Sequence, residues 1–207
     1  MTAADYARAR RLLSRRDPVM AALIRRHGSC GLARAQHTDP FTALTRAIIA
    51  QQLSSKAAAT IAGRFNALFD GAPSPAAIDA VPDAELRTAG LSGPKIRYMR
   101  DLCARVADGS LPLASLPSLG DDEVIAALTQ VKGIGRWTAE MFLMFRLHRP
   151  DVLPVGDLGI VKAVQRAYRL RKTPDAARLQ KIGEPWRPYR SIACWYLWAS
   201  LDNAPDA

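Results

Sequence analysis

The chain has 207 residues, 49% of them hydrophobic and 23% charged, and its formal net charge at pH 7 is +10. That length suffices for one well-filled core or for two small lobes, and the composition is that of a soluble globular protein. A membrane-spanning helix is excluded, because the sequence contains no run of about eighteen apolar residues. The arginine-rich N-terminus lacks the apolar core of a signal peptide; it partly resembles a transit peptide, but Asp5 and the helical pattern favour an ordinary helix.

Positive charge is distributed unevenly along the chain. Residues 1–38 contain eight arginines and two acidic residues, whereas residues 39–150 contain twelve basic and eleven acidic residues. Residues 151–207 carry nine basic and six acidic residues. Such a charge is compatible with simple solubility, but it also attracts nucleic-acid phosphates without regard to sequence. Charge alone therefore leaves nucleic-acid binding open.

The cysteines and histidines show no metal-binding pattern. Cys30, Cys103 and Cys194 lie far apart and form no Cys-x-x-Cys motif, and the three histidines fit no ligand spacing. We therefore expect no zinc ion and no iron–sulfur cluster. An odd number of widely spaced cysteines fits a reducing, cytoplasmic setting.

Apolar residues recur at helical spacing almost throughout, without the alternation of a β-strand or an Asn-Gly hairpin. Prolines, serines and aspartates mark the expected helix starts, and glycines mark several ends. Asp121 or Asp122 is the expected cap of the helix that ends at residue 130. The sequence thus predicts an all-α protein of about ten to twelve helices joined by short loops. After an N-terminal helical region, the predicted helices lie at 40–52, 55–70, 73–80, 82–89, 94–108, 122–130, 136–147, 158–170, 174–182 and 188–201.

The change in charge along the chain suggests two helical lobes. Residues 1–38 and 150–207 would form a discontinuous terminal lobe, and residues 39–149 a central lobe that ends in a helix-hairpin-helix motif at 121–147. We expect a cleft between the lobes, because pockets favour such junctions. The loop around residue 157 would lie where the chain crosses from one lobe to the other.

The segment Val131-Lys132-Gly133-Ile134-Gly135-Arg136 has the pattern of a tight turn between two helices. Each glycine permits a backbone angle or a close approach that a side chain hinders, and Ile134 can pack between the helices. The N–H groups around the glycines then face outward at a helix start, where they bind an anion such as a DNA phosphate. A plain helix–helix turn is the alternative, but the capped helix before it and the Trp-Thr-Ala segment after it favour DNA binding.

Asp157 follows a stiff apolar Val-Leu-Pro-Val-Gly approach. It fits two roles that do not exclude each other, N-cap of the following helix and catalytic carboxylate. Glu140, one turn after Trp137, is the other acid near the hairpin, and its position is typical of a solvated helix face. Phe142 and Phe145 are expected in the core.

Four blocks of the sequence resemble the helix-hairpin-helix/Gly-Pro-Asp superfamily of DNA glycosylases, and within it the 3-methyladenine DNA glycosylase II (alkylbase) branch. Together they span most of residues 41–198, and the last two are specific to this branch. The blocks are FTALTRAIIAQQLSSKAAATI from Phe41, GLSGPKIRYMRDL from Gly90, VKGIGRWTAEMFLM through LPVGDLGI from Val131, and WRPYRSIACWYLW from Trp186.

This resemblance implies an all-α, two-lobed fold in which the hairpin and Asp157 line the cleft, with Asp157 as the catalytic carboxylate. Lyase members of the family carry a lysine where this chain has Trp137, so the chain resembles members that break the glycosidic bond without cutting the strand. Trp198 aligns with an aromatic residue of the pocket, and Met141 replaces an aromatic residue seen in one member. Trp137, Trp198 and Met141 are therefore the expected substrate-binding residues.

The resemblance also implies how the chain would hold DNA. Gln52 aligns with the residue that the family inserts into the DNA stack, where Leu53 would help to fill the gap. The expected DNA-binding residues are Gln52, Leu53, Lys132, Gly133, Ile134, Gly135, Arg136 and Thr138.

The implied activity is that of a monofunctional glycosylase, which flips alkylated purines such as 3-methyladenine and 7-methylguanine out of duplex DNA and hydrolyses the N-glycosidic bond. A bifunctional oxidised-base glycosylase/lyase and a non-catalytic hairpin protein that binds DNA structure remain alternatives. We expect a monomer without a cofactor, although carbonyl groups of the hairpin could hold a monovalent or divalent cation.

Overall fold

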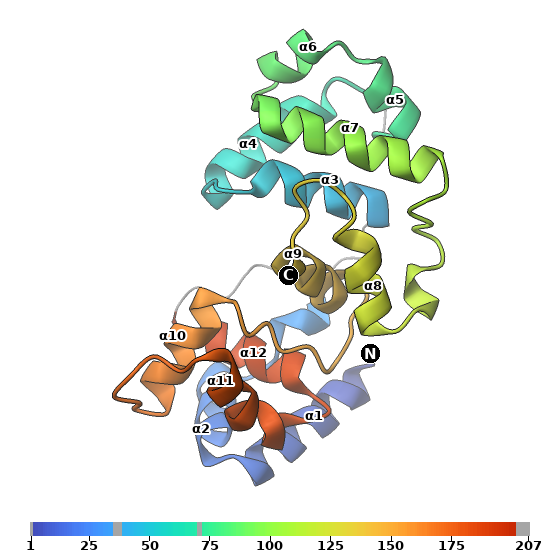
Figure 1. The fold of residues 1–207 in the computed structure, drawn as a ribbon. Helices are drawn as coiled ribbons and strands as arrows, with labels where there is room; N and C mark the ends of the chain where they lie inside the picture. The colour runs from blue at the N-terminus through green and yellow to red at the C-terminus, as the bar shows by residue number, and fades with distance from the viewer. Residues whose placement is uncertain (1, 35–38, 70–71, 202–207) are drawn as a thin grey trace. The chain divides into compact units, whose positions relative to one another are not determined.

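The protein, seen in a computed structural model, is built of helices (Figure 1). The structure describes residues 2–34, 39–69 and 72–201, and every regular element within these ranges is helical, as the sequence predicts. In this described part of the chain, no helix is both long enough and apolar enough to cross a membrane.

The chain divides into two compact units. The terminal unit combines residues 1–37 with residues 143–207, and the central unit comprises residues 38–142. Both ends of the chain thus contribute to one unit, while a single continuous segment makes the other. The charge pattern predicts that the central unit ends at residue 149, seven residues after its end in the structure.

The terminal unit is organised around its last helix, α12 (Arg190–Ala199). Every residue from 191 to 199 is buried, because α12 packs against helices from both chain ends. The other elements are α1 (Ala3–Arg16), α2 (Pro18–His27), the 3-10 turn Gly31–Arg34, most of the π-helical turn Phe142–Arg146, α10 (Leu158–Ala167), α11 (Ala176–Gly183) and the 3-10 turn Glu184–Trp186.

Asp17 ties these segments together. It separates α1 from α2 and caps α2, because its Oδ1 accepts hydrogen bonds from the N–H groups of Val19 (2.8 Å) and Met20 (3.2 Å). Its Oδ2 accepts from the indole Nε1 of Trp186 (2.9 Å) and from the hydroxyl of Tyr168. Burial, together with the adjacent Asp17 carboxylate, raises the pKa of Tyr168, so this hydroxyl remains a donor.

The central unit is built on α7 (Gly93–Ala107), which packs against three other helices of the unit, α3, α5 and α6 (Figure 1). Its remaining elements are α3 (Pro40–Ala50), α4 (Ser55–Asn66), α5 (Pro75–Ala80), α6 (Asp83–Thr88), the 3-10 turn Leu116–Ser118, α8 (Asp121–Leu128) and α9 (Arg136–Met141).

Helix starts agree with the sequence patterns more closely than helix ends do. Asp39 caps α3 through hydrogen bonds to two backbone N–H groups, and Ser54 caps α4. The expectation that an aspartate caps α8 is wrong. Gly120 is the N-cap, and the Glu123 carboxylate accepts its N–H at 2.7 Å. The two aspartates lie inside the first turn, where they face the positive end of the helix dipole.

Candidate active site and DNA-binding hairpin

The hairpin joins α8 to α9 within the central unit. Gly133 lies at the turn with φ of +80°, a left-handed conformation that favours glycine. Ile134 is buried beside it, as expected, so only its backbone is accessible to a ligand. Gly135 is the N-cap of α9 and offers no side chain to the first-turn N–H groups. The result is a helix start suited to an anion.

Two residues from other helices hold this turn in place. The Tyr98 ring packs so closely against Gly133 that a Cβ atom on the glycine would lie 2.2 Å from Cδ2 of the ring. Gln51, at the end of α3, donates a hydrogen bond of 2.7 Å from Nε2 to the carbonyl oxygen of Gly133. Gly133 is therefore required both for its backbone angle and for the absence of a side chain.

Asp101 of α7 braces the hairpin at Lys132. Its Oδ2 accepts the Lys132 N–H at 2.9 Å and the Arg105 Nε at 3.0 Å, and its Oδ1 lies 3.6 Å from the Lys132 Nζ. Burial alone would raise the pKa of Asp101, but these hydrogen bonds and charges outweigh it and hold the pKa below the ordinary value. The backbone of Lys132 is thus fixed, while its side chain stays exposed.

The loop between α3 and α4 is tied to the hairpin by Gln51 and carries Gln52 and Leu53 at its tip. Gln52 has φ of +59°, which costs about 1 kcal/mol or more for a residue with a side chain. Leu53 is 37% exposed, which is unusual for a large apolar side chain in this protein. At the end of α3, half-buried Lys95 donates from Nζ to the Ile49 carbonyl oxygen at 2.7 Å. A strained residue beside an exposed leucine on a braced loop is typical of a binding loop.

α9 presents Trp137 to the surface and buries Glu140. The Trp137 side chain is 50% exposed, and Met141, one turn later, is half-buried. The expectation that Glu140 lies on a solvated face is wrong, because the residue is only 4% exposed and forms an ion pair with the Arg136 Nε at 2.9 Å. A buried carboxylate needs such a partner, since desolvation without one is costly.

Asp157, like Asp17, is a buried carboxylate of the terminal unit. It is 7% exposed and is the N-cap of α10. This confirms the capping role that the sequence predicts for Asp157. Its Oδ1 accepts hydrogen bonds from the Ile160 N–H (2.7 Å) and from the indole Nε1 of Trp198 (3.0 Å). These two donors fix the orientation of the carboxylate.

An aromatic pair lies beside this carboxylate. The rings of Trp198 and Phe145 are stacked, with centroids 6.0 Å apart and an interplanar angle of 25°. Gly159 makes room for the arrangement, because a Cβ atom there would lie 3.0 Å from the Asp157 Oδ1 and 3.2 Å from the Trp198 ring. Phe145, which the sequence placed in the core, is half-buried and extends the aromatic surface next to Asp157.

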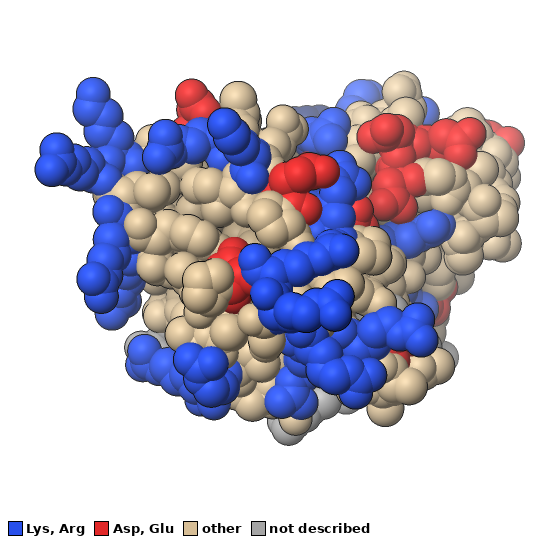
Figure 2. All heavy atoms as spheres, turned by 90° about the horizontal axis from the view of Figure 1, so that it is seen from below, with Lys and Arg blue, Asp and Glu red and all other residues tan. Residues whose placement is uncertain are grey.

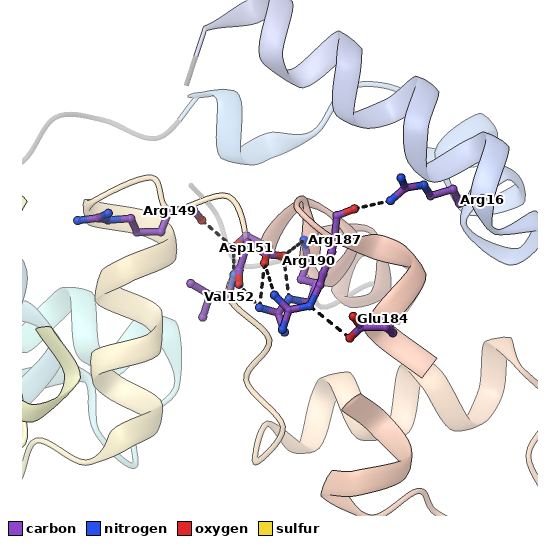
Figure 3. Close-up of polar contacts among 8 residues, drawn as sticks. Arg16, Arg149, Asp151, Val152, Glu184, Arg187 and Arg190 are labelled. Atoms are coloured by element: carbon purple, nitrogen blue, oxygen red, sulfur yellow. Dashed lines mark hydrogen bonds and ion pairs between the residues drawn. The ribbon is translucent and has the colours of Figure 1, made fainter. Parts of the chain in front are cut away.

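The loop that leads to Asp157 is fastened to the start of α12 (Figure 3). Asp151 receives the Arg190 guanidinium on both carboxylate oxygens, at 2.7 and 2.9 Å, and the Arg187 guanidinium at 3.0 Å. Ser191 donates to the Arg149 carbonyl oxygen at 2.7 Å and accepts the Val152 N–H at 2.9 Å. Arg190 and Ser191 therefore hold the loop in place.

The residues expected at the site fall into two groups. Asp157 and Trp198 meet in the terminal unit through a direct hydrogen bond. The others lie in the central unit, where Gln51 connects the loop with Gln52 and Leu53 to the hairpin. Thr138 is half-buried in the first turn of α9, and the side chains of Lys132 and Arg136 are exposed. Across the described ranges, no three His, Cys, Asp or Glu residues gather in a way that could hold a metal ion.

Sequence reasoning missed the residues that act at a distance along the chain. Gln51, Tyr98 and Asp101 support the hairpin but stand far from it in the sequence, and no local pattern marks them. The position of Phe145, twelve residues before Asp157 at the end of the hairpin helix, could have indicated a place near the carboxylate. The sequence analysis placed its side chain in the core instead.

Comparison with known proteins places the chain in one family. A family model described as "HhH-GPD superfamily base excision DNA repair protein" matches residues 45–188. The chain is 38% identical, over 77% of its own length and 72% of the relative's, to DNA-3-methyladenine glycosylase 1 of Schizosaccharomyces pombe.

Solved structures give the same relationship. A 3-methyladenine DNA glycosylase of S. pombe in complex with abasic DNA is 33% identical, with a TM-score of 0.82 over 94% of this chain and 97% of that one. A DNA-3-methyladenine glycosidase of Bacillus halodurans is 38% identical, with a TM-score of 0.73 over 89% of each chain.

Proposed function

Because this chain belongs to the HhH-GPD superfamily of base excision DNA repair proteins, we propose that it is a monofunctional DNA glycosylase that excises alkylated purines such as 3-methyladenine and 7-methylguanine. The observation that carries this proposal is the buried Asp157 carboxylate, which Ile160 and Trp198 orient beside an aromatic pair. The names of the relatives supply the substrate class, and the residues of this chain supply a mechanism.

DNA is engaged through the central unit. The hairpin N–H groups bind a backbone phosphate, with Lys132 and Arg136 adding positive charge nearby. The target base leaves the stack at a cost of a few kcal/mol, about the cost of unpairing and unstacking one nucleotide. Gln52 and Leu53 enter the gap, because both are exposed on a loop that Gln51 fastens to the hairpin.

The extruded base is a cation when N3 or N7 is alkylated. The face of an indole ring such as Trp198 or Trp137 favours a cation by about 0.5 to 2 kcal/mol. The glycosidic C1′–N bond breaks with its electron pair going to the base, which leaves as a neutral molecule and therefore needs no strong acid. The sugar acquires oxocarbenium character, which the Asp157 carboxylate stabilises.

Water completes the reaction. A water molecule oriented by Asp157 attacks C1′ and transfers a proton to the surrounding water, so the products are the free base and an abasic site with a C1′ hydroxyl. A lyase would instead need an amine nucleophile, and this chain has Trp137 at the position where lyase relatives carry lysine. The mechanism uses only the chain, DNA and water.

Purified protein tests this function directly. We expect it to release free 3-methyladenine or 7-methylguanine from alkylated duplex DNA, with strands breaking only after alkali. Asp157→Asn keeps the N-cap acceptor and the approximate shape, so it should retain DNA affinity while base release falls by at least about 10²-fold, the loss expected for one electrostatic stabiliser.

Three outcomes would contradict the proposal or one of its parts. Strand cutting without alkali would assign a lyase. Tight binding to damaged duplexes without release of any base would assign a protein that only recognises DNA structure. Wild-type turnover by Asp157→Asn would remove Asp157 from its role.

A further inference from the structure

The terminal unit contains a surface groove that the proposed reaction does not use. The groove lies between α1 and α2 and has a volume of about 590 Å³. Its residues recur every three or four positions along α1, so they share one face of that helix. They are Ala7, Arg10, Arg11, Ser14 and Arg15 from α1, with Ile24 from α2.

The arginines of this groove have no acidic partner within the described ranges. Both acids of residues 1–38 are used at helix ends: Asp5 accepts the Thr2 N–H at 2.7 Å, and Asp17 caps α2. The Nε atom of Arg10 is buried and lacks a hydrogen-bond partner among the described residues. Such a donor is unfavourable by itself, and an anion beside the same guanidinium would offset part of that cost.

The chemistry of the groove fits a phosphodiester backbone. Guanidinium groups bind phosphate oxygens through two parallel hydrogen bonds, and the Ser14 hydroxyl adds a neutral donor. Ala7 and Ile24 give the groove an apolar side that sugars can contact. Figure 1 draws α1 and α2 at its lower edge, and Figure 2, which views the protein from below, shows far more of this face in blue (Lys and Arg) than in red (Asp and Glu).

We propose that this groove is a second DNA-backbone site, which binds phosphates of the duplex independently of the hairpin. The proposal rests on the proposed function in one respect, because it takes the polymer to be DNA. Contacts of this kind carry no sequence information, but they release counterions and strengthen binding at low salt. The groove would hold undamaged and damaged duplexes alike.

The test compares two variants that each lose two positive charges from the terminal unit. Arg11→Gln/Arg15→Gln removes exposed arginines of the groove, and Arg25→Gln/Arg26→Gln removes exposed arginines of α2 outside it. Binding to an undamaged duplex is measured by fluorescence anisotropy over a KCl series. We expect the slope of log K against log[KCl] to become shallower by about 1 to 2 in the groove variant, since each lost phosphate contact removes about 0.9.

The control variant should change this slope by less than half as much. Equal changes in both variants, or no change in either, overturn the proposal, because general charge would then explain the binding or the groove would contribute nothing. The proposal is also overturned if the groove variant loses binding to anionic phosphatidylglycerol vesicles while its DNA slope is unchanged. The groove would then be assigned to binding a membrane surface. Base release by the wild type is measured separately, so failure of the proposed function does not affect this comparison.

Discussion

The Trp198 side chain serves Asp157 in two ways that can be separated by substitution. Its Nε1–H donates to the Asp157 Oδ1 at 3.0 Å, and its ring stacks with Phe145. The hydrogen bond orients the carboxylate, whereas the ring contributes an aromatic surface. In the proposed mechanism the two properties would act on different steps: the orientation of Asp157 on the chemical step, and the aromatic surface on binding of the base.

Trp198→Phe retains an aromatic ring and removes the donor. A hydrogen bond to a charged group is worth about 1.5 to 3 kcal/mol, so we expect base release at saturating enzyme to slow by roughly tenfold to a hundredfold. Affinity for lesion-containing duplex should change little. Single-turnover rates and equilibrium binding measure the two effects. A loss confined to affinity would show that the indole acts only on binding.

Single residues were predictable where their role is local. Asp157 caps the helix that it precedes, and Ile134 is buried in the turn that contains it. Gln51 was not predictable, because its partner Gly133 lies 82 positions away. Glu140 was misassigned for a related reason: helical spacing shows which residues share a face, but it does not show which face the rest of the unit covers.

At the scale of the elements, the hairpin depends on support from two other helices. Gln51, at the end of α3, holds the Gly133 carbonyl oxygen. From α7, Tyr98 packs against the turn and Asp101 accepts the N–H of Lys132. An isolated turn of this sequence would sample many conformations. In the folded unit its N–H groups are held in place in advance, so the proposed binding of a DNA phosphate would have a smaller entropy cost.

Two glycine substitutions separate stability from phosphate binding. Gly133→Ala introduces a side chain at positive φ and against the Tyr98 ring, so we expect a loss of roughly 1 to 3 kcal/mol in stability and weaker DNA binding. Gly135→Ala meets no atom within 4 Å and should leave stability nearly unchanged, while its methyl group hinders phosphate approach. Urea unfolding measures the stability of the two variants, and titration with DNA measures their binding. Equal losses of stability in both variants would contradict the role given to the Tyr98 contact.

The Asp101 brace predicts a particular pH dependence. Because its pKa is lowered in the folded protein, Asp101 contributes stability above the ordinary carboxyl pKa of about 4 and loses it as the pH falls through the lower folded value. Wild type should therefore be more stable than Asp101→Asn by a constant amount around neutral pH. This difference should shrink as the pH falls below about 4. Urea unfolding of both proteins across this pH range measures the difference. A difference independent of pH would exclude the brace.

Elements were predictable from their starts. The Asp39-Pro40 and Ser54-Ser55 pairs marked α3 and α4, because a short polar side chain before a helix satisfies N–H groups that the helix leaves unpaired. Ends were less certain, and α4 stops at Asn66, before the expected end at residue 70. The π-helical turn after α9 had no signal, since its side chains also fit an ordinary helix.

At the scale of the whole molecule, the terminal unit needs both ends of the chain. Asp17, from the N-terminal part, accepts hydrogen bonds from Tyr168 and Trp186, and Tyr196 of α12 donates to the Gly28 carbonyl oxygen at 2.8 Å. The unit is therefore held together by contacts that span more than 150 positions. The charge pattern suggests that the two ends of the chain share one unit. It does not indicate which residues join them.

Asp17→Asn tests this junction. The amide retains one oxygen and cannot accept all four hydrogen bonds, so we expect the protein to lose roughly 2 to 3 kcal/mol in stability. Tyr168→Phe removes a single donor and should cost less. Urea unfolding followed by tryptophan fluorescence measures both. Midpoints equal to the wild type in both variants would show that other contacts hold the segments together.

The same division has a consequence for synthesis on the ribosome. The central unit is one continuous segment, so a nascent chain can complete it soon after residue 142 has emerged. α1 and α2 can pack on each other early, but the surfaces that they bury against α12 stay uncovered until α12 has been translated. In newly made protein, α1 and α2 therefore stay open to aggregation or proteolysis for longer than the central unit does.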